Sequence, residues 1–205
     1  MLDGTYRKPL RDNWHDNRDG VGYDWSHQNS ITQRAHDGVD IFPRSATSLP
    51  QVFAPFSARV AAVHIVGEGY TANSDPLIAL PWEGYSKYPN IYGSYIWLYS
   101  TDAGDSTHAG SGGFFVFYCH LQTDDPILRA MATRAVENKS VTAIEAVGTM
   151  GNTGNAGDQP QLHVEIHLPQ RLSEGSTFNC TKCRPSPRQL TAVNPFPSLS
   201  NAKAR

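Results

Sequence analysis

The sequence has little of three things: cysteine, net charge and long apolar runs. Three cysteines in 205 residues are too few for a disulfide framework. The 17 basic and 19 acidic residues leave a net charge of −2, which argues against nucleic acid or another polyanion as a partner. No segment approaches the roughly 18 consecutive apolar residues of a membrane-spanning helix, and the first residues lack the apolar core of a secretory signal. We therefore expect no membrane span, and the route of any export stays open.

The cysteines that are present carry a weak signal. Cys180 and Cys183 form one C-x-x-C pair, and Cys119 stands alone. Such a pair is compatible with a short disulfide or two ordinary thiols and, without a second pair, less so with a zinc site.

Glycine, proline and aromatic residues are, by contrast, plentiful. There are 17 Gly, 14 Pro, 8 Phe, 4 Trp and 9 Tyr, while only 18% of the residues are charged. This composition is typical of a β-rich globular protein, and the length fits one domain of roughly 100–200 residues with additions. We interpret residues 1–35 as a polar arm that packs on the core, 36–200 as the domain, and 201–205 as a tail. Segments 67–93 and 101–113 are predicted as long rim loops, because turn-forming residues punctuate them.

Apolar runs predict the strands of this domain. Val52–Val66 contains Pro55, which favours two strands with a turn over one strand. Residues 95–100 and 114–121 are predicted as two strands joined by the second rim loop, and residues 141–150 are strand-like.

One helix is predicted. Asp124 and Asp125 precede Pro126, an acidic start that predicts a helix over residues 126–138. We therefore expect a mainly β domain, an antiparallel sheet or sandwich with an open cleft, one short helix and long loops.

The clearest strand runs from residue 161 to 168. Aliphatic and polar residues alternate strictly there: Leu162, Val164, Ile166 and Leu168 with Gln161, His163, Glu165 and His167. Successive side chains of a strand point to opposite faces, so one face is aliphatic and the other carries metal-competent groups. A solvated sheet face would account for this strand taken alone.

A second polar cluster precedes a short apolar run. His36 and Asp40 are four residues apart across Gly38, which allows a turn before a strand. Imidazole and carboxylate are standard zinc ligands, and His163 is the obvious candidate for a third. Three such ligands leave an open position, as in a catalytic rather than a structural zinc site.

Two weaker features lie between these clusters. His120 ends an apolar strand, a position more often held by a satisfied core or edge histidine than by a catalyst. The glycine-rich run 148–154 requires tight turns or close backbone approach just before the strand at 161.

Taken in order, the segments HDGVD, YCHL, VGTMGNTG and QLHVE resemble the lysostaphin-type (LytM-type) zinc endopeptidases of bacterial cell walls. The resemblance spans about residues 36–166, and the closing VNPFPSL is similar to the family's carboxyl-terminal segment. It implies a LytM-type fold and one zinc ion per chain, bound by His36, Asp40 and His163. It also implies that His120 is the catalytic histidine beside the metal.

The sequence departs from the family at one position, where Gln161 replaces the first histidine of the His-x-His motif. A glutamine amide donates a hydrogen bond but does not titrate. His120 would then carry out all proton transfer. Because losing one oxyanion-type contact costs about 3–4 kcal/mol, we expect a slowed enzyme rather than an inactive one.

Four further residues complete the predicted site region. Glu165 is expected to orient a zinc ligand, with a solvated glutamate as the alternative. Tyr95 and Trp82 are expected beside the substrate, while packing of the rim loop is an equal alternative for Trp82. His167, roughly 13 Å along the strand from His163, is predicted at the surface or rim.

The functional expectation is a zinc metalloendopeptidase that hydrolyses peptide stems or cross-bridges of peptidoglycan in the periplasm or cell wall. The sequence is compatible with a hydrolase delivered as an antibacterial effector (a toxin) and with a lysin. An immunity or regulatory protein is then a further candidate partner. The alternative, favoured by Gln161, is a catalytically impaired, zinc-bearing homologue that binds the wall or activates a partner.

Overall fold

The computed structural model describes residues 14–16, 38–43, 49–75, 78, 89–100, 114–171 and 188–193. Within these residues no helix is both long and apolar enough to cross a membrane. His36, Trp82, Cys180 and Cys183 lie outside them, as do the second rim loop and the tail.

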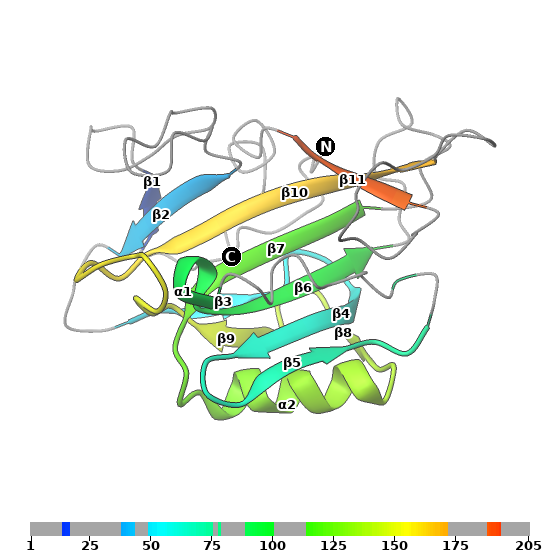
Figure 1. Ribbon diagram of the computed structural model, residues 1–205, viewed down its shortest axis with the longest axis horizontal. Helices are drawn as coiled ribbons and strands as arrows, with labels where there is room; N and C mark the ends of the chain where they lie inside the picture. Colours follow the sequence, from blue (N-terminus) through cyan, green and yellow to red (C-terminus); the bar gives the residue numbers. More distant parts are fainter. Residues whose placement is uncertain are drawn as a thin grey trace.

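The described residues are mainly β-strands. The strands are β1 (Trp14–Asp16), β2 (Val39–Pro43), β3 (Gln51–Phe53), β4 (Ala58–Ile65), β5 (Gly69–Ala72), β6 (Ser94–Ser100), β7 (Phe114–Leu121), β8 (Ser140–Val141), β9 (Ala146–Thr149), β10 (Leu162–Arg171) and β11 (Arg188–Val193). A large sheet has the order β1-β2-β10-β7-β6-β4-β5, with β11 on β10 and β8 on β4, while β3 and β9 form a second sheet (Figure 1). The pairs are antiparallel, which confirms the expected fold class.

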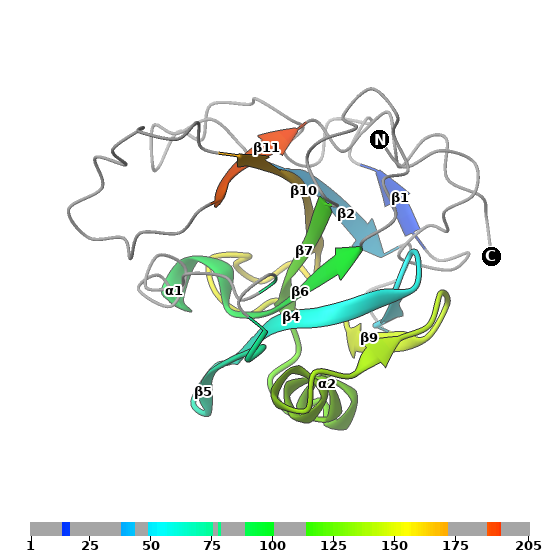
Figure 2. The same ribbon diagram turned by 90° about the vertical axis from the view of Figure 1, so that its right-hand side faces the viewer.

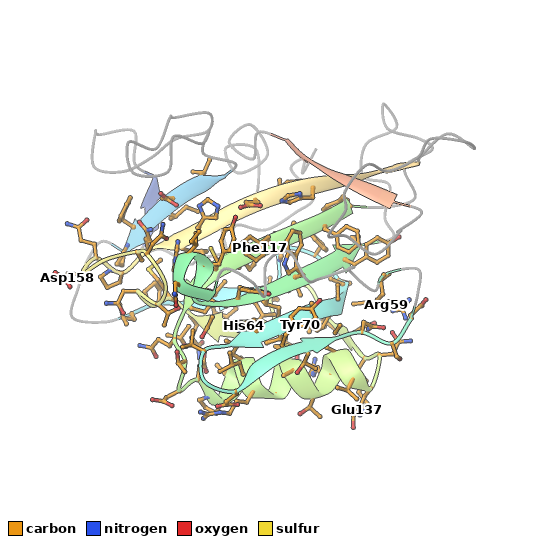
Figure 3. The ribbon with its side chains drawn as sticks, viewed as in Figure 1. Arg59, His64, Tyr70, Phe117, Glu137 and Asp158 are labelled. Atoms are coloured by element: carbon orange, nitrogen blue, oxygen red, sulfur yellow. The ribbon has the colours of Figure 1, made fainter. Side chains whose placement is uncertain are left out.

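The large sheet has an aliphatic face and an aromatic face. Its aliphatic face, β3, β9 and helix α2 (Pro126–Val136) enclose the main core, and Figure 2 shows α2 and β9 on the same side of the curved sheet. Leu162, Val164 and Ile166 of β10 point into this core, as their alternation predicts. The opposite face carries a buried cluster that includes Tyr95, Trp97, Tyr99, Phe115, Phe117 and Cys119. Figure 3 labels Phe117 near the middle of the sheet.

Helix α2 begins where the sequence predicts and ends two residues early. The Asp125 carboxylate accepts a hydrogen bond from the Ile127 N–H at 2.8 Å, and Pro126 occupies the first turn. Its buried side chains are Leu128, Met131 and Ala135. Asn138 adopts a left-handed backbone with φ 55°, which closes the helix before residue 138.

The sequence predictions for two segments are wrong in detail. Residues 141–150 give two short strands in different sheets, β8 and β9, because the turn at Ile144, with φ 67°, redirects the chain. The first rim loop also contains structure. Gly67 and Gly69, with φ 85° and 104°, form the turn into β5, and a short helix α1 (Pro89–Tyr92) follows later.

The other predicted elements are found close to their expected positions. The break at Pro55 separates β3 from β4, which lie in different sheets. The strands β6 and β7 pair as a hairpin. In the predicted arm, β1 is a short strand that pairs with β2, where an irregular segment was expected.

Candidate metal and catalytic site

Two of the predicted zinc ligands meet across neighbouring strands. The register places Asp40 of β2 opposite His163 of β10, and His163 opposite Cys119 of β7. Residues that lie opposite each other share a face of the sheet, here the aromatic face. The His163 Nδ1 donates to Asp40 Oδ1 at 2.8 Å, although the two residues are 123 positions apart. Both side chains are buried, with residue exposures of 2% for Asp40 and 6% for His163.

The imidazole of His163 lies between two carboxylates. Its Nε2 donates to Glu165 Oε1 at 2.9 Å, and the second oxygen of Glu165 accepts from His167 Nε2 at 2.5 Å. Burial alone would lower the pKa of His163, but its hydrogen bonds to Asp40 and Glu165 and their charges raise that pKa to about 10. Burial likewise opposes ionisation of Glu165, yet the two histidines lower its pKa to about 2. The cluster therefore holds positive charge between anionic groups.

This donor set fits a divalent cation. A carboxylate oxygen and an imidazole nitrogen are zinc donors, and here the His163 Nδ1 directs its proton at Asp40 Oδ1 over 2.8 Å. Metal binding requires a deprotonated imidazole, so an ion would replace that proton. In the described part of the chain, no group of three or more His, Cys, Asp or Glu forms a metal site. The third predicted ligand, His36, falls outside that part.

Gly38 leaves the space that the His163 ring occupies. A Cβ at Gly38 would lie 2.6 Å from the ring atoms Cε1 and Nε2 of His163, and 2.5 Å from the Val164 carbonyl oxygen. Such contacts are closer than atoms tolerate. The glycine is therefore required for space beside the imidazole, in addition to any turn.

His120 reaches the same region through an irregular backbone. Regular alternation would direct its side chain to the face opposite Cys119. Between Leu121 and Tyr118, however, β7 advances three residues while β6 advances two, from Ser94 to Ile96, which is a β-bulge.

The bulge is accompanied by a left-handed backbone at His120, with φ 63°. This conformation is uncommon for residues other than glycine and costs about 1 kcal/mol. The His120 ring comes to lie 6.0 Å from the His163 ring, centroid to centroid, at an angle of 71°. Its Nδ1 donates to the Thr153 carbonyl oxygen at 2.8 Å. No glycine or asparagine marks this bulge, since residues 114–122 contain neither.

The other predicted site residues take different positions. Gln161 is partly buried, and its backbone N–H donates to the Gly151 carbonyl at 3.0 Å, just before His163 on the same side of β10. Tyr95 is fully buried and stacks on His64 at 5.1 Å. Burial, reinforced by the nearby Cys119, raises the pKa of the Tyr95 phenol. Figure 3 labels His64 and its cross-strand neighbour Tyr70.

The prediction that His167 lies at the rim is wrong. Its residue exposure is 6%, and its ring packs against Trp97 at 4.9 Å. The solvated alternative for Glu165 is wrong as well, because Glu165 is only 1% exposed. The cause is the position of β10 in the sheet interior beside the aromatic side chains of β6 and β7, which spacing along one strand does not reveal.

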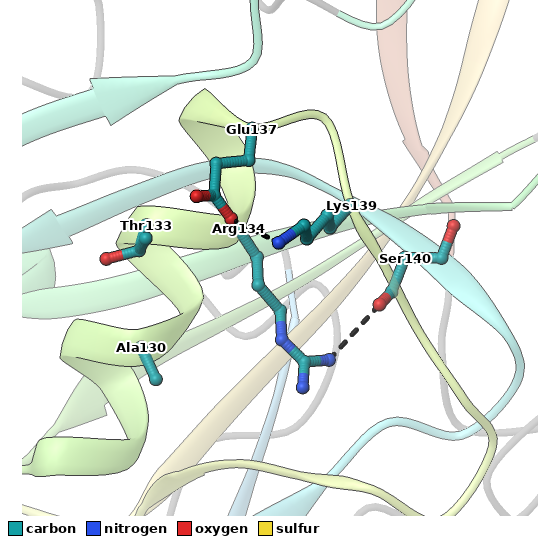
Figure 4. A pocket seen from close by; sticks show the side chains of 6 residues that line it. All are labelled: Ala130, Thr133, Arg134, Glu137, Lys139 and Ser140. Atoms are coloured by element: carbon teal, nitrogen blue, oxygen red, sulfur yellow. Dashed lines mark hydrogen bonds and ion pairs between the residues drawn. The ribbon is translucent and has the colours of Figure 1, made fainter.

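A separate hollow lies between α2 and β8 and is lined by Ala130, Thr133, Arg134, Glu137, Lys139 and Ser140 (Figure 4). Arg134 donates to the Ser140 carbonyl at 3.1 Å, and Lys139 pairs with Glu137 at 2.8 Å. Helix α2 packs on the aliphatic face, so this hollow is separate from the Asp40–His163 pair. Its charged groups are paired within the hollow or with the adjacent backbone, and we assign no function to it.

Comparison with solved structures identifies the fold. The antimicrobial peptidase lysostaphin from Staphylococcus simulans matches 98% of this chain and 55% of its own, with 18% identity and a TM-score of 0.50. The chain has the lysostaphin-type fold. The separately solved lysostaphin catalytic domain matches 88% of this chain and 90% of its own, with 21% identity and a TM-score of 0.46.

A zinc-containing peptidase from Vibrio cholerae matches 80% of this chain at 16% identity, with a TM-score of 0.40. The match spans 34% of the length of that peptidase. No family model and no curated protein sequence matches this chain.

Proposed function

We propose that the protein is a zinc-dependent peptidoglycan endopeptidase that hydrolyses peptide stems or cross-bridges. The observation that carries the proposal is the convergence of Asp40, His163 and His120 at one end of β10 and β7. The lysostaphin-type fold and the order of the four sequence segments support it.

The proposed zinc ligands are Asp40, His163 and, outside the described residues, His36. When bound, such an ion supplies Lewis acidity at the scissile peptide bond. Glu165 holds the far side of the His163 ring and so fixes its orientation toward Asp40.

His120 is the proposed general base and acid. It takes a proton from the attacking water and returns one to the leaving amine. Gln161 donates a hydrogen bond from its amide and does not titrate, so the proton transfers depend on His120 alone. Trp82 is proposed to border the substrate, whereas Tyr95 is fully buried and is proposed to support the site from behind. We propose the periplasm or the cell wall as the place of action.

A second function is favoured by one observation, the replacement of the motif histidine by Gln161. In this alternative the protein keeps zinc and binds the wall or activates a partner without hydrolysis. Delivery as an antibacterial effector or a lysin is compatible with the hydrolytic proposal, and an effector would be recognised by a dedicated immunity protein.

The test is mass spectrometry of muropeptides released from purified sacculi, together with the metal content of the same samples. We expect about one zinc per chain and cleavage by the wild type. His120→Ala should lose at least a hundredfold in rate while retaining zinc, because it removes the general base. Gln161→His should gain about tenfold or more.

Gln122→Ala, two residues beyond His120, serves as the matched control and should cleave like the wild type. A zinc-loaded wild type that binds sacculi without cleaving them, and that gains hydrolysis with Gln161→His, would establish the alternative function. Absence of bound zinc would refute both functions.

A further inference from the structure

Thr153 joins three parts of the chain beside His120. Its hydroxyl donates to the Leu121 carbonyl at 2.7 Å and accepts from the Ser94 N–H at 2.9 Å. Its carbonyl oxygen accepts from His120 Nδ1 at 2.8 Å. One residue therefore contacts the end of β7, the start of β6 and the imidazole.

The backbone on either side of Thr153 packs closely on its neighbours. A Cβ on Gly154 would lie 2.5 Å from Gly93 N and from the Ile91 carbonyl oxygen. A Cβ on Gly151 would lie 2.8 Å from Gln122 N. The glycine-rich run thus packs its backbone on the ends of β6 and β7. The Thr153 carbonyl is positioned by this contact together with the two hydrogen bonds of the Thr153 hydroxyl.

The hydrogen bond to that carbonyl selects one form of the imidazole. A carbonyl oxygen only accepts, so a neutral His120 must carry its proton on Nδ1. The basic lone pair is then on Nε2, at the far edge of the ring.

We infer that Thr153 is a positioning residue for His120: it fixes the Nδ1–H tautomer and the ring orientation, so that Nε2 is the atom that exchanges protons with the substrate. The inference rests on the proposed function for the role of His120. The tautomer itself is a property of the folded chain and does not depend on that role.

The experiment combines nitrogen-15 NMR of histidine-labelled protein with kinetics. The His120 signals are assigned by their loss in His120→Gln, and the shifts of the two ring nitrogens report which one carries the proton. Thr153→Val removes the hydroxyl at nearly constant volume, Thr153→Ser retains it, and Thr133→Val on the exposed side of α2 is the matched control.

We expect the Nδ1–H tautomer in the wild type, in Thr153→Ser and in Thr133→Val. In Thr153→Val we expect a mixture of the Nδ1–H and Nε2–H tautomers. Thr153→Val should lower kcat about tenfold or more with KM within twofold, and Thr153→Ser should restore kcat to within about threefold. A wild type with the Nε2–H tautomer overturns the inference without any variant, and so does a folded Thr153→Val that keeps the wild-type tautomer. If the wild type lacks hydrolytic activity but shows the expected tautomers, the proposed function fails and the positioning role stands.

Discussion

At the scale of single residues, the site is built around His163, which has a carboxylate on each side. Asp40 contacts Nδ1 and Glu165 contacts Nε2, and both carboxylates are buried. Glu165 in turn contacts His167, whose ring packs on Trp97. The orientation of the proposed ligand therefore depends on Glu165 and His167 as well as on Asp40.

Glu165→Gln should weaken zinc binding about 10- to 100-fold, because the neutral amide holds the His163 ring less firmly and makes it less basic. Competition with a chromogenic chelator measures the dissociation constant. Glu68→Gln, a half-exposed glutamate paired with Arg129, is the control and should bind zinc like the wild type. Equal affinity in both variants would show that Glu165 does not support the ligand.

The sequence predicts part of this arrangement. Strict alternation along residues 161–168 correctly separates the aliphatic side chains from His163 and Glu165. The position of His120 does not follow from such a pattern, since it depends on a bulge and a positive φ that neighbouring strands impose. Burial of His167 is likewise a property of the assembled sheet.

At the scale of elements, the turn between β8 and β9 is tied to α2 by one carboxylate. Glu145 accepts from the Thr142 N–H at 2.9 Å and pairs with Arg134 of α2 at 2.6 Å. Partial burial opposes its ionisation, but these hydrogen bonds and the Arg134 charge outweigh burial and lower its pKa. The turn also contains Ile144 in a left-handed conformation, so it needs such an anchor.

Glu145→Gln should cost about 1 kcal/mol of stability at pH 7, since the amide keeps the shape but not the charge. Because the pKa of Glu145 is lower in the folded state, its ionised carboxylate stabilises the fold fully at pH values above the unfolded pKa of about 4.3. This stabilisation is lost as the pH falls through the folded pKa. The difference between variant and wild type should therefore shrink as the pH is lowered toward 3. Urea unfolding at both pH values measures it.

The matched control is Glu137→Gln, whose carboxylate pairs only with exposed Lys139 among the described residues and should matter by less than about 0.5 kcal/mol. A penalty for Glu145→Gln that is the same at pH 3 and pH 7 would rule out the charge as its cause.

Sequence alone predicts α2 and its Asp125 cap, because those signals are local. It does not predict the division of residues 141–150, which depends on which sheet each half joins.

At the scale of the whole molecule, the proposed metal centre links distant parts of the chain. Strand β2 lies near the edge of the large sheet and pairs with β10 through only three residue positions. An ion shared by Asp40 and His163 would tie these two strands together in addition to their backbone hydrogen bonds.

Zinc should therefore raise the melting temperature by about 5–10 °C at a free concentration near 100 times its dissociation constant. A chelator should reverse the shift, and Asp40→Ala should abolish it. Asp124→Ala, an exposed aspartate at the start of α2, should keep the full shift. Differential scanning calorimetry with and without zinc decides the matter, and an unchanged midpoint for the wild type would count against a metal held by β2 and β10.

The pairing of β2 with β10 also has a consequence for biosynthesis. Asp40 is synthesised before its partner His163, which follows 123 residues later. Because chains are synthesised from the amino terminus, the two halves of the proposed cation site coexist only after the 123 residues that separate them have been added. Loading of the proposed metal would therefore follow the synthesis of His163, and a nascent chain truncated before that residue would lack the site.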